Sequence, residues 1–210
     1  MKLSSLLMTS GLFVAAFSFI QCSSTSSNPV AGKTGDAGTS SAGCQAYCDA
    51  ITTNCTSGNL QYSDKDHCMS VCTAFPVGAA NDTSGNTLGC RTYHANLAAG
   101  TAANATTHCP HAGPGGDGVC GKICDGYCQL AEKFCVGSAK IYTNAADCQA
   151  TCAATTGTAR FNVSIVTGDE TACLLYHVQE ASIDSTHCTD DLAKRPGDAG
   201  ATTGGSVTCQ

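Results

Sequence analysis

The cysteines of this chain fall into two series with a common spacing, and this repeat narrows the folds that the chain can adopt. The first five cysteines of the two series are offset by 80 residues, and three more follow in each at looser offsets. The first series is Cys44, Cys48, Cys55, Cys68, Cys72, Cys90, Cys109 and Cys120. The second series is Cys124, Cys128, Cys135, Cys148, Cys152, Cys173, Cys188 and Cys209. A fixed period of this kind predicts tandem copies of one structural unit.

Tyrosines and histidines follow the same register. The matching residues are Tyr47 with Tyr127, Tyr62 with Tyr142, Tyr93-His94 with Tyr176-His177, and His108 with His187. We interpret the chain as a duplication with insertions in the later loops. The two predicted modules span residues 43–121 and 122–210, because the boundary falls between the two cysteine series.

Large apolar residues are scarce, so each module needs another source of stability. Leu, Ile, Val and Phe make up about 13% of the residues after Cys22, a fraction typical of disordered chains. Such a chain buries too little apolar surface to offset the entropy that is lost on folding. The 17 cysteines can supply the difference, since one disulfide contributes ~2–4 kcal/mol in an oxidising compartment.

The spacing at the start of each series favours a helix. Cys44, Cys48 and Cys55 stand at i, i+4 and i+11, which places them on one face of a helix. Gly58 follows where this helix is expected to stop. The second series repeats the same pattern.

Two further helices are expected in each module. The second helix should begin after Ser63 or Thr143, whose hydroxyls can cap it, and it carries the next Cys-x3-Cys pair. The third should begin after Thr87 or Thr171, and the rest is expected to be Gly/Pro/Asp-rich loop. The sequence therefore predicts a small, disulfide-rich, all-α fold with two tandem copies of a module of about three short helices and long loops.

The paired Cys-x3-Cys motifs resemble those of the α-hairpinins, in which two antiparallel helices are joined by two disulfides. The resemblance covers about 30 residues of each copy, and the fifth cysteine of each series departs from it. It implies the pairs Cys44–Cys72, Cys48–Cys68, Cys124–Cys152 and Cys128–Cys148. The same scheme then joins Cys55 to Cys90 and Cys109 to Cys120, with equivalent bonds in the second copy. Eight cysteines allow about a hundred pairings, so spacing alone leaves the alternatives open.

The N-terminus has the features of a secretory signal peptide in residues 1–21. Lys2 supplies a positive charge, and an uncharged run of roughly 15 apolar-to-neutral residues extends from Leu6 to Ile20. The run is shorter than the ~20 residues that span a bilayer, and no later segment of the sequence qualifies as transmembrane. The chain is therefore expected to be exported.

Cys22 directly follows this run and resembles the lipid-attachment cysteine of bacterial lipoproteins. The resemblance implies that Cys22 is acylated and that residues 22–42, rich in Ser, Thr and Gly, form a flexible tether. The motif departs from the usual one at Gln21 and Phe19, where a small residue and Leu are typical. Cleavage after Ser18 is the alternative, and it leaves Cys22 as an ordinary thiol. Parity favours lipidation, because the other 16 cysteines can all pair with one another.

Two phrases, SGNTLGCRTYH at 84–94 and THCPHAG at 107–113, are similar to those of uncharacterised cysteine-rich lipoproteins of myxobacteria-like bacteria. This resemblance extends over nearly the whole mature chain and implies no activity. The expected location is the cell envelope, on the outer or cytoplasmic membrane and facing an oxidising compartment, with secretion as the alternative. The expected partners are the membrane, through the lipid anchor, and an envelope or extracellular protein.

Metal binding is the less favoured interpretation of the histidines. Those near cysteines are His94, His108 and His111 in the first copy and His177 and His187 in the second. Imidazoles are good metal ligands, but paired thiols are not, and the usual zinc spacings are absent. The second copy also has Thr189-Asp190-Asp191 where the first has the His111 region. We therefore expect no metal and no other cofactor.

Catalysis and nucleic-acid binding are not expected either. The sequence contains no Gly-x-Ser-x-Gly, phosphate-loop, His-Glu-x-x-His or haem-attachment motif, so no catalytic residue is predicted. The net charge of −6 gives no basic surface for nucleic acid. The favoured hypothesis is an exported lipoprotein that acts as a structural or interaction module of the cell envelope. The alternative is an envelope lipoprotein that captures a ligand or metal with the Tyr and His residues of the third helix and the Cys-Pro-His loop.

Overall fold

The computed structural model of the protein describes residues 37–155, 157, 159–168, 170–190, 192 and 209. The predicted signal peptide (1–21), most of the predicted tether (22–42) and the predicted lipid attachment at Cys22 lie outside the described residues. Residues Asp36–Gln210 form one compact unit. Among the described helices, none combines the length and the apolar character needed to cross a bilayer.

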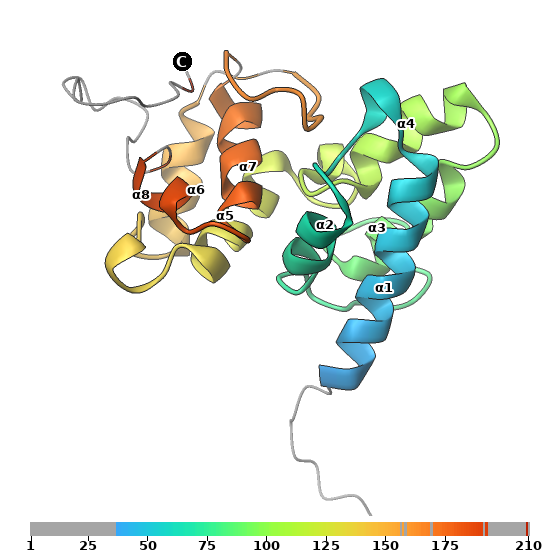
Figure 1. Ribbon diagram of the computed structural model, residues 1–210, viewed down its shortest axis with the longest axis horizontal. Coiled ribbons are helices and arrows are strands. Elements are labelled where there is room, and N and C mark those ends of the chain that lie inside the picture. The colour runs from blue at the N-terminus through green and yellow to red at the C-terminus, as the bar shows by residue number, and fades with distance from the viewer. Residues whose placement is uncertain are drawn as a thin grey trace, which may run out of the picture. The chain divides into compact units, whose positions relative to one another are not determined.

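The described residues form eight α-helices and no β-strand (Figure 1). The helices are α1 (Ala37–Asn54), α2 (Lys65–Cys72), α3 (Leu88–Leu97), α4 (Ala102–Ala112), α5 (Ile123–Phe134), α6 (Ala145–Ala153), α7 (Glu170–Glu180) and α8 (Thr186–Asp190). Single 3-10 turns lie at η1 (Ser57–Asn59), η2 (Gly116–Gly118) and η3 (Gly137–Ala139). The predicted small, disulfide-rich, all-α fold is confirmed. We refer to α1–α4 as the first helix group and to α5–α8 as the second.

Polar side chains cap the helices close to the predicted positions. Thr87 caps α3 as predicted, because its hydroxyl accepts a hydrogen bond from the Cys90 amide at 3.1 Å. The prediction of Ser63 as the cap of α2 was wrong. Asp64 caps this helix instead, and its carboxylate accepts from the His67 amide at 2.9 Å. In α6 the cap likewise lies one residue later than predicted.

Each group contains one helix more than predicted. The segment expected to be loop after α3 forms α4. Thr101 caps this helix, and its hydroxyl accepts from the Asn104 amide at 3.1 Å. Pro110 lies in the last turn of α4, although it lacks an amide proton. The short α8 occupies the corresponding place in the second group. The predicted start of α7 after Thr171 was also wrong, because the helix begins at Glu170.

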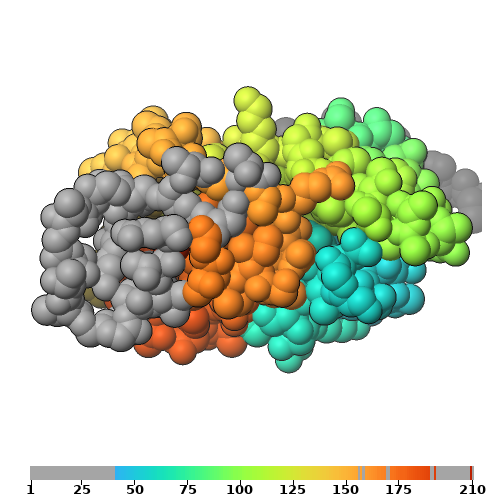
Figure 2. Space-filling view, turned by 90° about the horizontal axis from the view of Figure 1, so that it is seen from above, coloured from blue at the N-terminus to red at the C-terminus, as the bar shows by residue number. Residues whose placement is uncertain are grey.

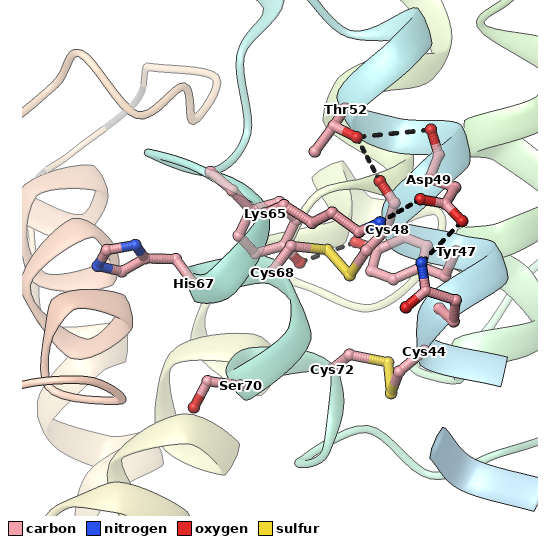
Figure 3. Close-up of a disulfide and its surroundings, with 12 residues drawn as sticks. Cys44, Tyr47, Cys48, Asp49, Thr52, Lys65, His67, Cys68, Ser70 and Cys72 are labelled. Carbon is pink, nitrogen blue, oxygen red and sulfur yellow. Dashed lines mark hydrogen bonds and ion pairs between the residues drawn. A yellow bond between two sulfur atoms is a disulfide. The ribbon is translucent and has the colours of Figure 1, made fainter. Parts of the chain in front are cut away.

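Eight disulfides hold the helices together, and each joins two cysteines of the same group. The first four bonds that the α-hairpinin resemblance implies are present, with Cα–Cα distances between 5.6 and 5.8 Å. Figure 3 shows Cys44–Cys72 and Cys48–Cys68 as two rungs between α1 and α2. The first cysteine of α1 pairs with the second cysteine of α2, and the second of α1 pairs with the first of α2. The two helices therefore run antiparallel. The bonds Cys124–Cys152 and Cys128–Cys148 join α5 to α6 in the same way.

The other predicted bonds were wrong. Cys55 pairs with Cys109 rather than Cys90, and Cys90 pairs with Cys120. The reason is the unpredicted helix α4, which carries Cys109 to the end of α1, where its sulfur lies 3.9 Å from the Asn54 carbonyl oxygen. The equivalent bonds of the second group are Cys135–Cys188 and Cys173–Cys209.

A pair of buried tyrosines lies beside the disulfides of each group. Tyr47 and Tyr62 pack edge to face, with ring centroids 6.2 Å apart and hydroxyl oxygens 2.8 Å apart. The Tyr47 hydroxyl donates to the Ala112 carbonyl at 2.7 Å, so the Tyr62 hydroxyl donates to Tyr47. Burial raises the pKa of both tyrosines, which keeps the hydroxyls protonated. Tyr127 and Tyr142 repeat the arrangement, with their hydroxyl oxygens 2.8 Å apart.

A buried arginine fixes the loop after α4. Arg91 on α3 is fully buried, and its guanidinium donates to the carbonyls of Thr87 at 3.3 Å and Pro114 at 3.1 Å. The same guanidinium lies 3.9 Å from the centre of the Phe75 ring, within range of a cation–π contact. Desolvation lowers the pKa of Arg91. The second group has Leu174 at the equivalent position of the repeat.

Main-chain and side-chain hydrogen bonds connect the two groups. The Gln61 amide donates to the Phe161 carbonyl at 3.2 Å, and the Val163 amide donates to the Leu60 carbonyl at 3.0 Å. In Figure 2 this part of the second group, coloured orange, lies against the cyan and green segments of the first. Residues 161–163 therefore link the two groups.

A polar cluster between α2 and α7 adds to this link. His67 points away from α1 in Figure 3, and its Nε2 lies 3.0 Å from a Glu180 carboxylate oxygen. Its Nδ1 lies 2.8 Å from the Asp64 carboxylate. The Ser63 hydroxyl donates to the other Glu180 oxygen at 2.7 Å. These four side chains hold the second helix of the first group against the second group.

We predict that non-reducing peptide mapping of the oxidised protein recovers the eight bonds of the structure. The decisive peptide is the one that contains Cys109, because α4 brings this cysteine to Cys55. A peptide that links Cys55 to Cys90, or one that joins the two groups, would contradict the arrangement of α4.

We also predict that Tyr47→Phe lowers the free energy of unfolding by about 1–3 kcal/mol, since it leaves the buried Ala112 carbonyl and the Tyr62 hydroxyl without this partner. Tyr93→Phe is the matched control, because Tyr93 is 36% exposed, and it should change stability by less than about 0.5 kcal/mol. Guanidinium unfolding with the disulfides intact measures both values. Equal losses in the two variants would refute the proposed role of the Tyr47 hydroxyl.

Candidate functional site

Three histidines of α3 and α4 converge in the first group. His94 on α3 is buried, and its Nε2 lies 3.2 Å from the Thr83 carbonyl oxygen. A carbonyl only accepts hydrogen bonds, so the neutral ring carries its proton on Nε2 and presents a lone pair on Nδ1. That Nδ1 lies 3.0 Å from Nδ1 of His108 on α4. The two rings thus face each other through the nitrogens that can bind a metal or a proton.

His111, one turn beyond His108 on α4, completes the cluster. Its Nε2 lies 3.5 Å from a carboxylate oxygen of Asp117, which also accepts a hydrogen bond from Nε of Arg160 at 2.9 Å. Its Nδ1 is buried and has no hydrogen-bond partner among the described residues. The ring centroid lies 5.0 Å from that of His94 and 5.9 Å from that of His108. We call His94, His108 and His111 the histidine triad.

The surroundings of His108 and His111 favour neutral rings. Desolvation lowers the pKa of His108, and the nearby His94 lowers it further. Desolvation also lowers the pKa of His111, with His94 as the next contributor, although Asp117 opposes the shift. Neutral imidazoles keep their lone pairs available at neutral pH.

The histidine triad has the composition of a metal-binding site. One ring nitrogen from each histidine can be chosen so that all three atoms lie within 4.8 Å of one another. The sulfurs of Cys90 and Cys120 also lie within 4.8 Å of a ring nitrogen of His94, but they are joined in a disulfide. Since thiolates are the sulfur ligands of metals, the imidazoles are the available ligands in the oxidised protein.

The second group repeats only part of this arrangement. Nδ1 of His177 lies 3.2 Å from Nδ1 of His187, and Nε2 of His177 lies 3.4 Å from the Val166 carbonyl oxygen. The residue that matches His111 in the repeat is Asp190. The second group therefore has a histidine pair where the first has a triad.

The structure places the other residues that the sequence singled out as follows. The Tyr93 ring stacks edge-on against His94 and is 36% exposed. Tyr176 is only half-buried. Every cysteine of the two series is in a disulfide, and Cys22 lies outside the described residues.

Two residues near the histidine triad had not been identified from the sequence. Asp117 lies in a glycine-rich turn, and Arg160 follows it by 43 residues in the other group. No local motif connects them, because their pairing depends on how the two groups pack. A surface cleft of about 230 Å³ lies beside this pair and is lined in part by Pro110, Asp117 and Arg160.

Comparison with protein families identifies the chain's family. Residues 21–125, half of the chain, match the C-terminal domain of the BfoA family, and the chain belongs to this family. The matched range includes the whole first helix group and the first residues of α5. No curated protein and no solved structure matches the chain.

We predict that His108 and His111 titrate below the ordinary histidine pKa of 6.5. Because the folded-state pKa is the lower one, the folded protein binds fewer protons than the unfolded chain. The associated stability is complete above about pH 6.5 and is lost as the pH falls through the folded-state pKa. NMR titration of the ring protons measures the midpoints, and midpoints at or above 6.5 would contradict the described environment.

Proposed function

We propose that the protein is an exported lipoprotein that serves as a disulfide-braced structural or interaction module of the cell envelope. The observation that carries this proposal is the state of the two cysteine series. All of their members pair, and each bond includes at least one buried cysteine. Disulfide-dense frames of this kind persist in oxidising compartments and are rare in the cytosol.

The N-terminal sequence supports a tether to the membrane. The apolar run that ends before Cys22 has the length of a signal peptide, and the polar segment after it has a linker composition. All other cysteines have partners within the folded unit, which leaves Cys22 available for acylation. The similarity to cysteine-rich lipoproteins of myxobacteria-like bacteria agrees with this location.

The internal recurrence supports the idea of two tandem modules. Bonds at equivalent positions join α1 to α2 and α5 to α6, and the tyrosine pairs recur beside them. The polar contacts between the groups turn the two modules into a single body. Such a body, joined to the membrane through the proposed tether, suits the binding of another envelope or extracellular protein.

We predict that the full chain, expressed in a bacterial host that processes lipoproteins, enters the membrane fraction. Its mass should correspond to a chain that starts at Cys22, carries acyl groups and lacks the hydrogens of eight disulfides. Cys22→Ser should release the protein from the membrane fraction without changing its disulfides, whereas Ser23→Ala should leave it attached. An unacylated chain that starts at Phe19 would refute the lipoprotein proposal.

A further inference from the structure

We propose that His94, His108 and His111 bind one divalent transition-metal ion of the kind that prefers imidazole nitrogen, such as Cu(II) or Zn(II). This binding activity goes beyond the envelope-module function and does not depend on it. It rests on the spacing, orientation and fixed positions of the three rings.

The spacing of the first two ligands matches a metal site. Two nitrogens that each bind an ion at ~2.0–2.1 Å lie about 2.9 Å apart in square-planar geometry and about 3.3 Å apart in tetrahedral geometry. The two Nδ1 atoms of His94 and His108 are separated by 3.0 Å. The rings therefore need little movement to bind the same ion.

The Nε2 atoms of His94 and His111 contact oxygen atoms that orient the two rings, as in known metal sites. Metal-ligating histidines usually donate their second ring proton to a carbonyl or a carboxylate. The Thr83 carbonyl has this role for His94, and the Asp117 carboxylate is placed for it beside His111. Both contacts leave Nδ1 as the lone-pair nitrogen, and Nδ1 of His111 is buried with no hydrogen-bond partner in the part of the chain that the structure describes. A metal ion would supply the partner that the Nδ1 lone pair of His111 lacks.

The protons balance without a change in the charge of the rings. In the metal-free protein the His94 lone pair accepts from the His108 Nδ1 proton across the 3.0 Å contact. When the ion binds, His108 loses this proton to water and gains one at Nε2, so it remains a neutral ligand. No redox step or co-reactant is required.

Disulfides fix the helices that carry the ligands. Cys90 lies one turn before His94 and is bonded to Cys120, and Cys109, next to His108, is bonded to Cys55. Disulfides thus hold both helices, α3 and α4, in place. Ligands on helices that are already fixed lose less conformational entropy when they bind an ion. His108 and His111 are only half-buried, so an ion can reach them from the surface.

The second group provides an internal comparison. His177 and His187 have the same facing nitrogens, but their repeat position for a third ligand holds Asp190 instead of histidine. We therefore expect one tight site per chain at the histidine triad and much weaker binding at the pair.

The test uses the oxidised full chain with Cys22→Ser, purified without a histidine tag, so that no free thiol competes for the ion. Calorimetry with Zn(II) at pH 7.5 should give one ion per chain, and the EPR spectrum of bound Cu(II) should show nitrogen couplings. His108→Gln and His111→Gln should each weaken binding by about tenfold or more. His187→Gln is the matched control and should leave the tight site unchanged. Intact mass and circular dichroism verify that each variant keeps its eight disulfides and its helices.

A second variant tests the site without removing a ligand. Asp117→Asn keeps a side chain that tolerates the positive φ of 45° at this position but removes the carboxylate that orients His111, and it should weaken binding by about tenfold. The absence of Zn(II) and Cu(II) binding to the folded, oxidised chain would overturn the proposal. Binding that survives both His108→Gln and His111→Gln, or that His187→Gln weakens equally, would overturn it as well.

Discussion

The double disulfide between two antiparallel helices is the constraint on which the rest of the structure depends. Large apolar side chains are too few to drive the folding of a chain of this length, whereas each disulfide contributes ~2–4 kcal/mol by restricting the unfolded state. The Tyr47–Tyr62 pair is buried beside the disulfides that join α1 to α2. Covalent bonds and a small aromatic core therefore replace the broad apolar core of an ordinary domain.

The disulfides also determine where the three histidines of the triad lie. Cys55–Cys109 attaches α4 to the end of α1, and Cys90–Cys120 attaches α3 to the turn that contains Asp117. Helices α3 and α4 then bring their three histidines together, as described above. The two groups differ at this point, because the first has a triad and a buried Arg91, whereas the second has a histidine pair and Leu174. The two helix groups thus share the pattern of disulfides but differ in their polar side chains.

The sequence predicted the parts of the fold that depend on short-range periodicity. The i, i+4 cysteines indicated helices, and the hydroxyl of Thr87 marked the start of α3. The sequence did not predict α4, because Pro110 and the nearby glycines are typical of loops. In the structure, tertiary contacts override that local preference. The error in the partner of Cys55 follows from the missing helix. The histidines were noticed individually, but their convergence, and the Asp117–Arg160 pair beside them, depend on packing between distant segments.

The most direct test of this account compares the oxidised protein with the fully reduced and alkylated protein at 25 °C, by far-UV circular dichroism and amide hydrogen exchange. If the disulfides replace the missing core, the reduced chain should lose most of its helical signal and its slowly exchanging amides. A reduced chain that keeps native helicity and protection would show that side-chain packing alone holds the fold, and it would contradict the account.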